Sequence, residues 1–481
     1  MNIKLKFNKD FDVSENCKFL INDIKKFQQQ NSYIHWKKSI IEITKLDSEI
    51  IDNRVLKIFL DNFSFLKNRY TKNILGFSGI LKQISRYIIL FFFNFFFKKL
   101  SNNSNKYKLL IDNITSADQL DRYESLIKLF GKENVFGITK DKSITLKKID
   151  FKFIPKIFNY KINYFQIFIL IKLFFLNSKI TFKEKVNFFY LSNKIINEFY
   201  WYSNLFKNYN FKNIIMEKHY YSNNIKNHLF KKSGGNYSCL IQKNINILNT
   251  NGFVYDADIL FSYSEKVNID RVKTLSNIKK NISVGSFFME NFSKRVSINI
   301  NNEISNESKY DIVCIGGNEL FPKNNFYNSY NSYSDDYLLH LDLLKKISID
   351  LPDLKVGFKH HSNNKFFYEE DYLKNSNVII IDQKRNSYKV ALNSKFICSW
   401  ASTMIIEMTT FRKFCYFLDP GLRNKQFLDD IKDSEFIRIK NYSEFLEKYE
   451  IAKNKNFLNL QDPYCLPSND VSNKIYQILK T

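Results

Sequence analysis

The last part of the chain alternates short apolar runs with amphipathic helical segments. From about residue 309 onward, strand-like runs such as YDIVCI, LKVGF and FCYFL are separated by segments with helical apolar spacing, such as DDYLLHLDLLKKISIDL. Short apolar runs between helices are typical of parallel strands buried on both faces. Parallel strands need long crossover connections, so the alternation favours a doubly wound α/β sheet. We therefore predict a Rossmann-like domain over 309–481.

A similar alternation of strands and helices precedes this domain in the chain. KLLIDN and NVFGITK read as strands that flank a helix capped by Ser116, a helical stretch runs from about 160 to 210, and strands resume with FKNIIM and YSCLI. This predicts a second Rossmann-like domain over 106–290 with a helical insertion. The asparagine-rich residues 291–309 are interpreted as the linker, and residues 1–105 as a helical N-terminal extension.

The composition excludes some classes of protein. The chain has 481 residues and a formal net charge of +25, which would suit a polyanionic partner. No helix-turn-helix, zinc-finger or RNP-type spacing accompanies this charge, and the abundant Lys and Asn fit an AT-rich genome, so we predict no nucleic-acid partner. Six cysteines are scattered singly, which excludes a disulfide scaffold and indicates a reducing compartment.

Two apolar stretches are candidates for contact with a membrane. Residues 88–97 (IILFFFNFFF) and 164–176 (YFQIFILIKLFFL) are both shorter than the roughly 20 residues that span a bilayer. The first is flanked by Arg86, Lys98 and Lys99, which suits either a helix in an anionic interface or a buried helix, and the second is interpreted as buried. With no secretory signal at the start, we expect a cytoplasmic protein that can lie on the inner face of the cytoplasmic membrane.

Polar residues that follow the strands of the last domain are candidate ligand contacts, because ligands of open parallel sheets bind beyond the carboxyl ends of the strands. Gly316 and Gly317 follow YDIVCI, where small residues let backbone amides approach a phosphate or simply form a turn. Lys359 and His360 follow LKVGF and offer donors to a phosphate, or form an ordinary solvated strand end.

A third group follows the strand FICSW. Ser402 and Thr403 start a helix, where hydroxyls can cap the backbone and help hold a phosphate. Glu407 lies one turn further on the same face, where its carboxylate could accept both hydroxyls of a ribose. Capping alone explains Ser402, but a carboxylate in the apolar run TMIIEM is expensive to bury without partners.

The run from Lys359 to Asp419 resembles the C-terminal donor domain of GT-B-type glycosyltransferases that build bacterial surface polysaccharides. It is most similar to the sialyltransferase and polysialyltransferase kind, and the glycerophosphate transferases of teichoic acid synthesis share the pattern. Those families hold the nucleotide phosphates with a His-Pro pair and a Ser-Ser or Ser-Thr pair. Ser402-Thr403 matches the second pair and His360 the first, although His361 stands in place of the proline.

The resemblance implies a GT-B-like fold, in which two Rossmann-like domains face each other across a cleft, and it implies a ribose contact for Glu407. An inverting transfer needs a base for the attacking hydroxyl. His219 and Glu217, and next Asp112, stand at strand ends of the first domain. The acidic base motif of the sialyltransferases is not found there. Asp256-Ala257-Asp258 spells a metal-binding tripeptide that is common by chance, so no metal or other cofactor is predicted.

We therefore expect a glycosyltransferase with a CMP- or UDP-linked sugar donor and a surface glycan or its lipid carrier as acceptor. Two alternatives remain open. A nucleotide-sugar 2-epimerase shares the architecture and the hydroxyl-pair-plus-Glu pattern. A noncatalytic scaffold would bind membranes or polyanions in a salt-sensitive way and would have no affinity for nucleotides.

Overall fold

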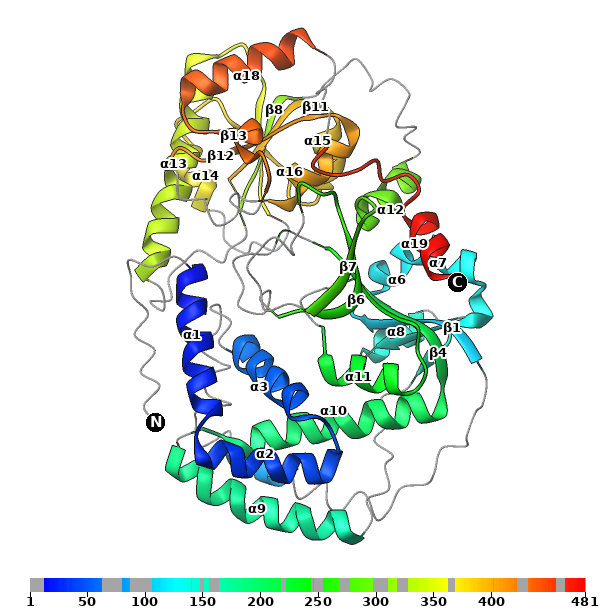
Figure 1. Cartoon of the computed structure of the whole chain (residues 1–481). Coiled ribbons are helices and arrows are strands. Elements are labelled where there is room, and N and C mark those ends of the chain that lie inside the picture. The colour runs from blue at the N-terminus through cyan, green and yellow to red at the C-terminus, as the bar shows by residue number, and fades with distance from the viewer. Residues whose placement is uncertain are drawn as a thin grey trace.

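The protein contains two separate parallel β-sheets (Figure 1). The computed structural model describes residues 13–62, 80–86, 106–139, 141–147, 151–154, 164–184, 186–217, 222–243, 245, 254–267, 277–296, 310–317, 328–361, 368–400, 402–421, 431–455 and 463–480.

The first sheet has seven strands in the order β3-β2-β1-β4-β5-β6-β7, and every neighbouring pair is parallel. The chain runs outward from β1 to β3 and then from β4 to β7 on the other side, so the order reverses between β1 and β4. The strands are β1 (Lys106–Ile114), β2 (Val135–Thr139), β3 (Phe153–Ile154), β4 (Asn210–Met216), β5 (Tyr237–Ile241), β6 (Asp256–Ser262) and β7 (Asn277–Ser283).

Helices cover both faces of this sheet. They are α6 (Ala117–Arg122), α7 (Glu124–Phe130), α8 (Lys142–Lys147), α9 (Tyr164–Glu184), α10 (Phe188–Asn208), α11 (Asn224–Lys232) and α12 (Phe287–Val296), with a short 3-10 helix η1 (Lys132–Asn134). The predicted cap is confirmed, because the Ser116 side chain accepts a hydrogen bond from the Gln119 amide. Gly131 follows α7 with a φ of 82°, a conformation that suits glycine.

The N-terminal helices share a core with the first sheet and its helices. These helices are α1 (Val13–Gln28), α2 (Asn31–Thr44) and α3 (Ser48–Asn62). Their buried side chains form one cluster with those of α9, α10 and β1. Trp36 donates a hydrogen bond of 2.8 Å to Ser192, and Arg54 forms an ion pair of 2.7 Å with Glu198. The region that the sequence suggested as an extension is thus packed against the first domain.

The second sheet has six parallel strands in the order β10-β9-β8-β11-β12-β13, and its order reverses between β8 and β11. The strands are β8 (Tyr310–Ile315), β9 (Val356–Lys359), β10 (Ile379–Ile381), β11 (Ser394–Ser399), β12 (Phe414–Leu418) and β13 (Arg438–Ile439). The helices are α13 (Asn328–Asp350), α14 (Tyr368–Leu373), α15 (Ser387–Leu392), α16 (Thr403–Met408) and α18 (Tyr442–Asn454), with 3-10 helices η5 (Thr409–Phe411) and η6 (Ser434–Ile437).

The chain crosses twice between the domains. Part of the predicted linker is helical, because α12 extends to Val296 and buries Phe287, Met289 and Phe292. Of these three residues, only Phe292 lies within the predicted linker 291–309. At the other end, α19 (Val471–Leu479) follows the second domain in sequence but packs against α7 of the first. Figure 1 shows α19 in red beside α7.

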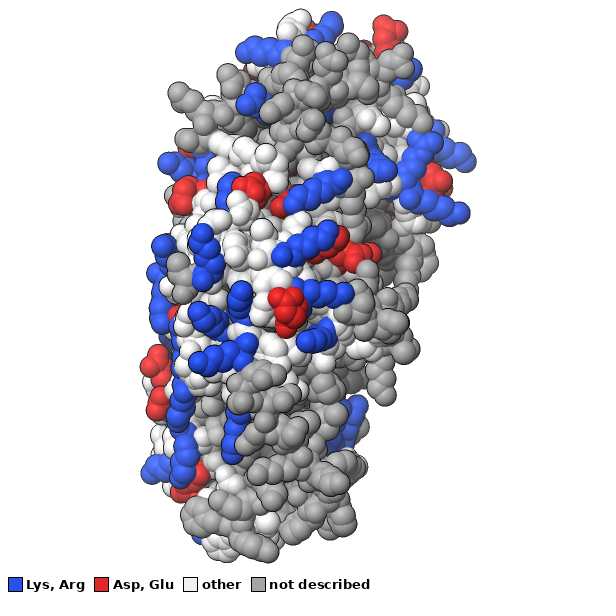
Figure 2. All heavy atoms as spheres, turned by 90° about the vertical axis from the view of Figure 1, so that its right-hand side faces the viewer, with Lys and Arg blue, Asp and Glu red and all other residues white. Residues whose placement is uncertain are grey.

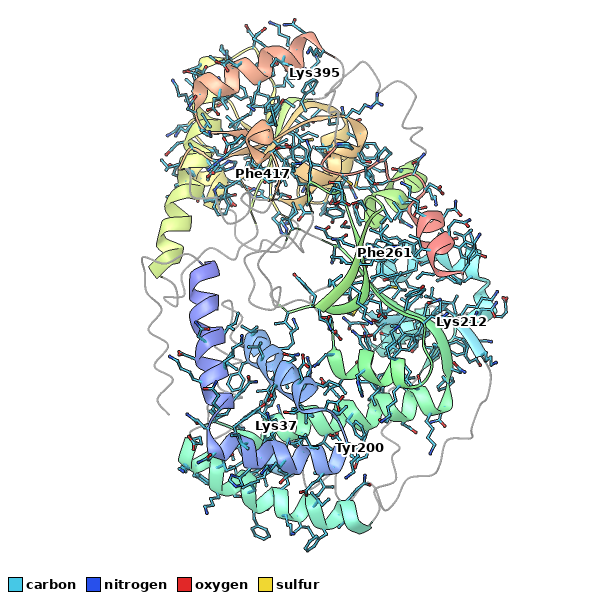
Figure 3. All side chains as sticks on the ribbon, viewed as in Figure 1. Lys37, Tyr200, Lys212, Phe261, Lys395 and Phe417 are labelled. Carbon is cyan, nitrogen blue, oxygen red and sulfur yellow. The ribbon has the colours of Figure 1, made fainter. Side chains whose placement is uncertain are left out.

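These two doubly wound sheets confirm the predicted α/β class and its GT-B-like pair of Rossmann-like domains. Figure 3 marks one buried phenylalanine in each sheet, Phe261 of β6 and Phe417 of β12. Among the described residues no helix is long and apolar enough to cross a membrane. Residues 88–97 lie outside that set. On the face in Figure 2, the Lys and Arg side chains are scattered, with Asp and Glu among them.

Candidate functional site at the domain boundary

The carboxyl edge of the second sheet brings together all the predicted nucleotide contacts. Gly316 and Gly317 follow β8, Lys359 ends β9 with His360 after it, and α16 follows β11. Strands β8 and β11 are neighbours at the point where the strand order reverses. Ligands of doubly wound sheets bind at such a switch point, so the sequence placed these residues at the edge where a ligand is expected.

The two glycines have backbone amides that already bond to protein groups. The Gly316 amide donates to the carbonyl of Lys359 at 2.8 Å, and the Gly317 amide donates to the Tyr337 hydroxyl at 3.0 Å. A Cβ atom at Gly316 would stand 2.8 Å from the Phe358 ring, closer than real contacts allow. Close packing therefore explains the glycine at 316 without a ligand.

Lys359 and His360 are fully buried and face protein partners. Lys359 Nζ donates to the carbonyl of Gln383 at 2.9 Å, and burial lowers the pKa of this lysine. His360 Nε2 lies 3.0 Å from Glu370 Oε1, and His360 Nδ1 lies 3.5 Å from Glu369 Oε2. The imidazole thus sits between two carboxylates, which hold its orientation.

The start of α16 contacts the first domain. The Ser402 side chain caps the helix by accepting from the Met404 amide at 3.3 Å, as predicted for a capping hydroxyl. Thr403 Oγ1 accepts from the backbone amide of Ile245 at 3.2 Å. Ile245 comes shortly after β5, so the hydroxyl pair lies where the two domains meet.

Glu407 is buried at the same boundary among three hydroxyl groups. Oε2 accepts from Tyr388 at 2.5 Å, and Oε1 accepts from Ser286 at 2.8 Å and lies 3.3 Å from the Tyr263 hydroxyl. Ser286 and Tyr263 belong to the first domain. Burial raises the pKa of Glu407 to about 6, although hydrogen bonds from the hydroxyls, that of Tyr388 first, oppose the shift. The carboxylate that the sequence analysis assigned to a ribose therefore joins the two domains.

The first sheet also presents charged groups at its switch point. Asp112 lies near the end of β1, where the pairing with β2 shifts register and Asn113 adopts a φ of 57°. Such a bulge redirects the side chains next to it. Asp112 Oδ2 accepts from Lys226 Nζ of α11 at 2.6 Å, and both side chains are buried. This predicted base is thus part of an ion pair.

Glu217, directly after β4, is paired in the same way. Its Oε1 lies 2.7 Å from Arg122 Nε, and its Oε2 accepts from the second guanidinium nitrogen at 2.8 Å. Lys243 lies nearby, after β5. Burial lowers the pKa of Lys243, the neighbouring Glu217 and Glu407 raise it, and the Arg122 charge adds to the lowering. The Lys243 ammonium is thus close enough to interact electrostatically with a carboxylate of each domain, Glu217 of the first and Glu407 of the second.

His219 lies outside the described residues. In the tripeptide Asp256-Ala257-Asp258, the Asp258 carboxylate forms ion pairs with Lys231 at 3.0 Å and with Lys279 at 2.9 Å. Among the described residues, no group of three or more His, Cys, Asp or Glu side chains could hold a metal ion.

Sequence reasoning missed the partners of these groups. Lys243 follows β5, so the rule that selects polar residues after strands would have found it. Arg122 and Lys226 lie on helices and carry no such signal. Tyr388 and Ser286 are ordinary hydroxyls that become notable only because Glu407 lies between them.

Comparisons with known proteins give only distant similarities. No protein-family model matches the sequence, and no curated protein matches it. Among solved structures, the UDP-N-acetylglucosamine 2-epimerase from Rickettsia bellii is 12% identical, with a TM-score of 0.40 over 78% of this chain and 96% of that one. The UDP-GlcNAc 2-epimerase from Neisseria meningitidis, bound to UDP-GlcNAc, is 13% identical, with a TM-score of 0.42 over 78% of this chain and all (100%) of that one.

The wall teichoic acid polymerase TagF is 10% identical, with a TM-score of 0.39 over 84% of this chain and 97% of its own. Sequence identities and TM-scores this low carry no information about the substrate or the reaction of this chain.

Proposed function

We propose that the chain is a glycosyltransferase that moves a sugar from a CMP- or UDP-linked donor to a growing surface polysaccharide or a lipid-linked glycan. The observation that carries the proposal is the contact of helix α16 of the second domain with the first domain. Thr403 and Glu407 of this helix both contact groups of the first domain. A transfer between two substrates needs the donor and the acceptor brought together, and a domain boundary at the switch point of the second sheet provides such a place.

The donor nucleotide belongs on the second domain in this proposal. Its phosphates would meet the amides and hydroxyls at the start of α16, and the Lys359 ammonium would supply positive charge. A ribose would bind Glu407, as in the sialyltransferase-like or glycerophosphotransferase-like donor domains that the sequence resembles. A carboxylate accepts about four hydrogen bonds, so ribose hydroxyls would share it with Ser286 and take the place of Tyr388.

The acceptor hydroxyl would attack from the first domain with inversion and without a metal. Glu217 and Asp112 each have a cationic partner, Arg122 and Lys226 respectively. The carboxylate oxygens that contact these cations are less accessible to an acceptor hydroxyl. We therefore rank His219, two residues after Glu217 in the chain, as the first choice for the base. Glu217 and Asp112 would then help to position the acceptor.

The test is a thermal-shift screen of the purified chain against CMP, CDP, UDP, GDP and ADP. A ligand at about 100 times its Kd stabilises the folded state by about 2.7 kcal/mol. We expect a shift with one pyrimidine nucleotide that Ser402→Ala and His360→Ala both abolish. Asn441→Ala is the matched control, because Asn441 caps α18 by accepting from the Glu444 amide at 2.9 Å, away from the site.

The outcomes separate the alternatives. No shift with any nucleotide in a folded sample would refute the transferase and favour a polyanion-binding scaffold. A shift with UDP, followed by acceptor-independent conversion of a UDP-sugar into its 2-epimer without nucleotide release, would identify an epimerase. Nucleotide release that requires a glycan acceptor would support the transferase.

A further inference from the structure

Helix α9 carries a row of exposed apolar side chains. Phe168, Ile171, Phe175 and Phe182 are 53%, 42%, 68% and 65% exposed. At about 100° per residue, they fall within about 60° of the helix circumference. Three of the four phenylalanines recorded as exposed among the described residues lie in this row, and the fourth is Phe436 of the second domain. Exposed apolar side chains gathered in one row indicate an interaction surface.

The opposite side of α9 is firmly packed. Ile169, Leu170, Leu173 and Ile180 are buried in the core that α9 shares with α2 and α10. The sequence analysis had interpreted residues 164–176 of this helix as buried, and the structure corrects this for one face. The helix is apolar on nearly all sides, but only one side has neighbours that cover it. In Figure 3, side chains of α9 project away from the molecule at its lower edge.

Lysines run beside the apolar row. Lys172, Lys179 and Lys183 are exposed and fall within about 40° of one another, directly next to the phenylalanines. Lys172 Nζ lies 4.4 Å from the centre of the Phe168 ring. The only acidic residue of α9, Glu184, is buried. Lys183 Nζ lies 4.0 Å from Glu184 Oε1, so three lysines share one acidic neighbour within the helix and the face combines bulky apolar groups with a net positive charge.

We propose that this face of α9, made of Phe168, Ile171, Lys172, Phe175, Lys179, Phe182 and Lys183, docks the chain on an anionic lipid surface. Aromatic side chains enter the headgroup boundary while lysines beside them attract acidic lipids. A second copy of the chain is a poorer occupant, because its lysines would meet these. In Figure 1, α9 lies at the end of the molecule away from the second domain, so docking there leaves the domain boundary uncovered.

Vesicle sedimentation of the full-length chain tests the proposal. We expect binding to phosphatidylcholine vesicles that contain phosphatidylglycerol, and much weaker binding to phosphatidylcholine alone. Each phenylalanine removed from the boundary should weaken binding about tenfold, so Phe175→Ser with Phe182→Ser should lower it on the order of 100-fold. Lys179→Ala should weaken binding about fivefold, and only on the anionic vesicles. The control Phe436→Ser removes an equally exposed ring, 67% exposed, from the second domain and should bind as wild type.

Several results would overturn the proposal. These are wild-type binding by the double variant, no binding of the wild type to either vesicle, or an equal loss in Phe436→Ser. Light scattering measures the oligomeric state of the wild type and of the double variant. If the wild type is a dimer and the double variant a monomer, the face is instead a contact between two copies of the chain. The replaced side chains are exposed, so unchanged circular dichroism should accompany each variant. Sedimentation needs no turnover, so failure here leaves the proposed transferase activity untouched.

Discussion

Replacing Glu407 with glutamine should remove a pH-dependent cost from the folded protein. Burial raises the pKa of Glu407 from 4.5 to about 6. The folded state therefore holds the proton more tightly than the unfolded chain. The resulting stabilisation is complete below about pH 4.5 and is lost as the pH rises through 6. A difference of about 1.5 pKa units corresponds to about 2 kcal/mol. Glu407 is only 3% exposed, so solvent screening does not reduce this figure.

The assay is urea unfolding of the wild type and Glu407→Gln at about pH 4 and about pH 7.5. The amide keeps the shape of the side chain, and the Tyr388 and Ser286 hydroxyls can turn to bond with it. We expect similar stabilities at the lower pH and a variant that is about 2 kcal/mol more stable at the higher pH. Glu450→Gln, at an exposed site, corrects for the loss of one negative charge. A stability difference between variant and wild type that stays constant with pH would refute the reasoning.

Two further substitutions test the packing around the site. Asp112→Asn leaves the buried Lys226 ammonium without its carboxylate and should cost about 3–5 kcal/mol in urea unfolding. Adding Lys226→Met should restore most of that loss, and a double variant no more stable than the single one would contradict the ion-pair account. Gly316→Ala drives a methyl group into the Phe358 ring and should cost about 1–3 kcal/mol by the same measurement. The cost should shrink in a Phe358→Leu background, and equal costs in both backgrounds would show that the ring is not the obstacle.

The sequence by itself determined the elements and the edge of the sheet that matters. Apolar runs such as those of β8 and β12 are recognisable because their burial pattern is local. The caps at Ser116 and Ser402 follow from hydroxyls placed a few residues before amides that need acceptors. Once the strands are known, the residues that follow them must lie at one edge, because all the strands are parallel.

Only the tertiary structure decided the partners of those residues. Glu407 meets Ser286 and Tyr263, which lie 121 and 144 positions earlier in the chain. Likewise, Arg122 reaches Glu217 across 95 positions. Spacing in the chain carries no information about such pairs, since they depend on how crossover helices pack and on where the chain returns between domains. The same holds for α9, whose sequence is apolar on both its packed face and its exposed face. Which face stays exposed was decided by its neighbours, α2 and α10.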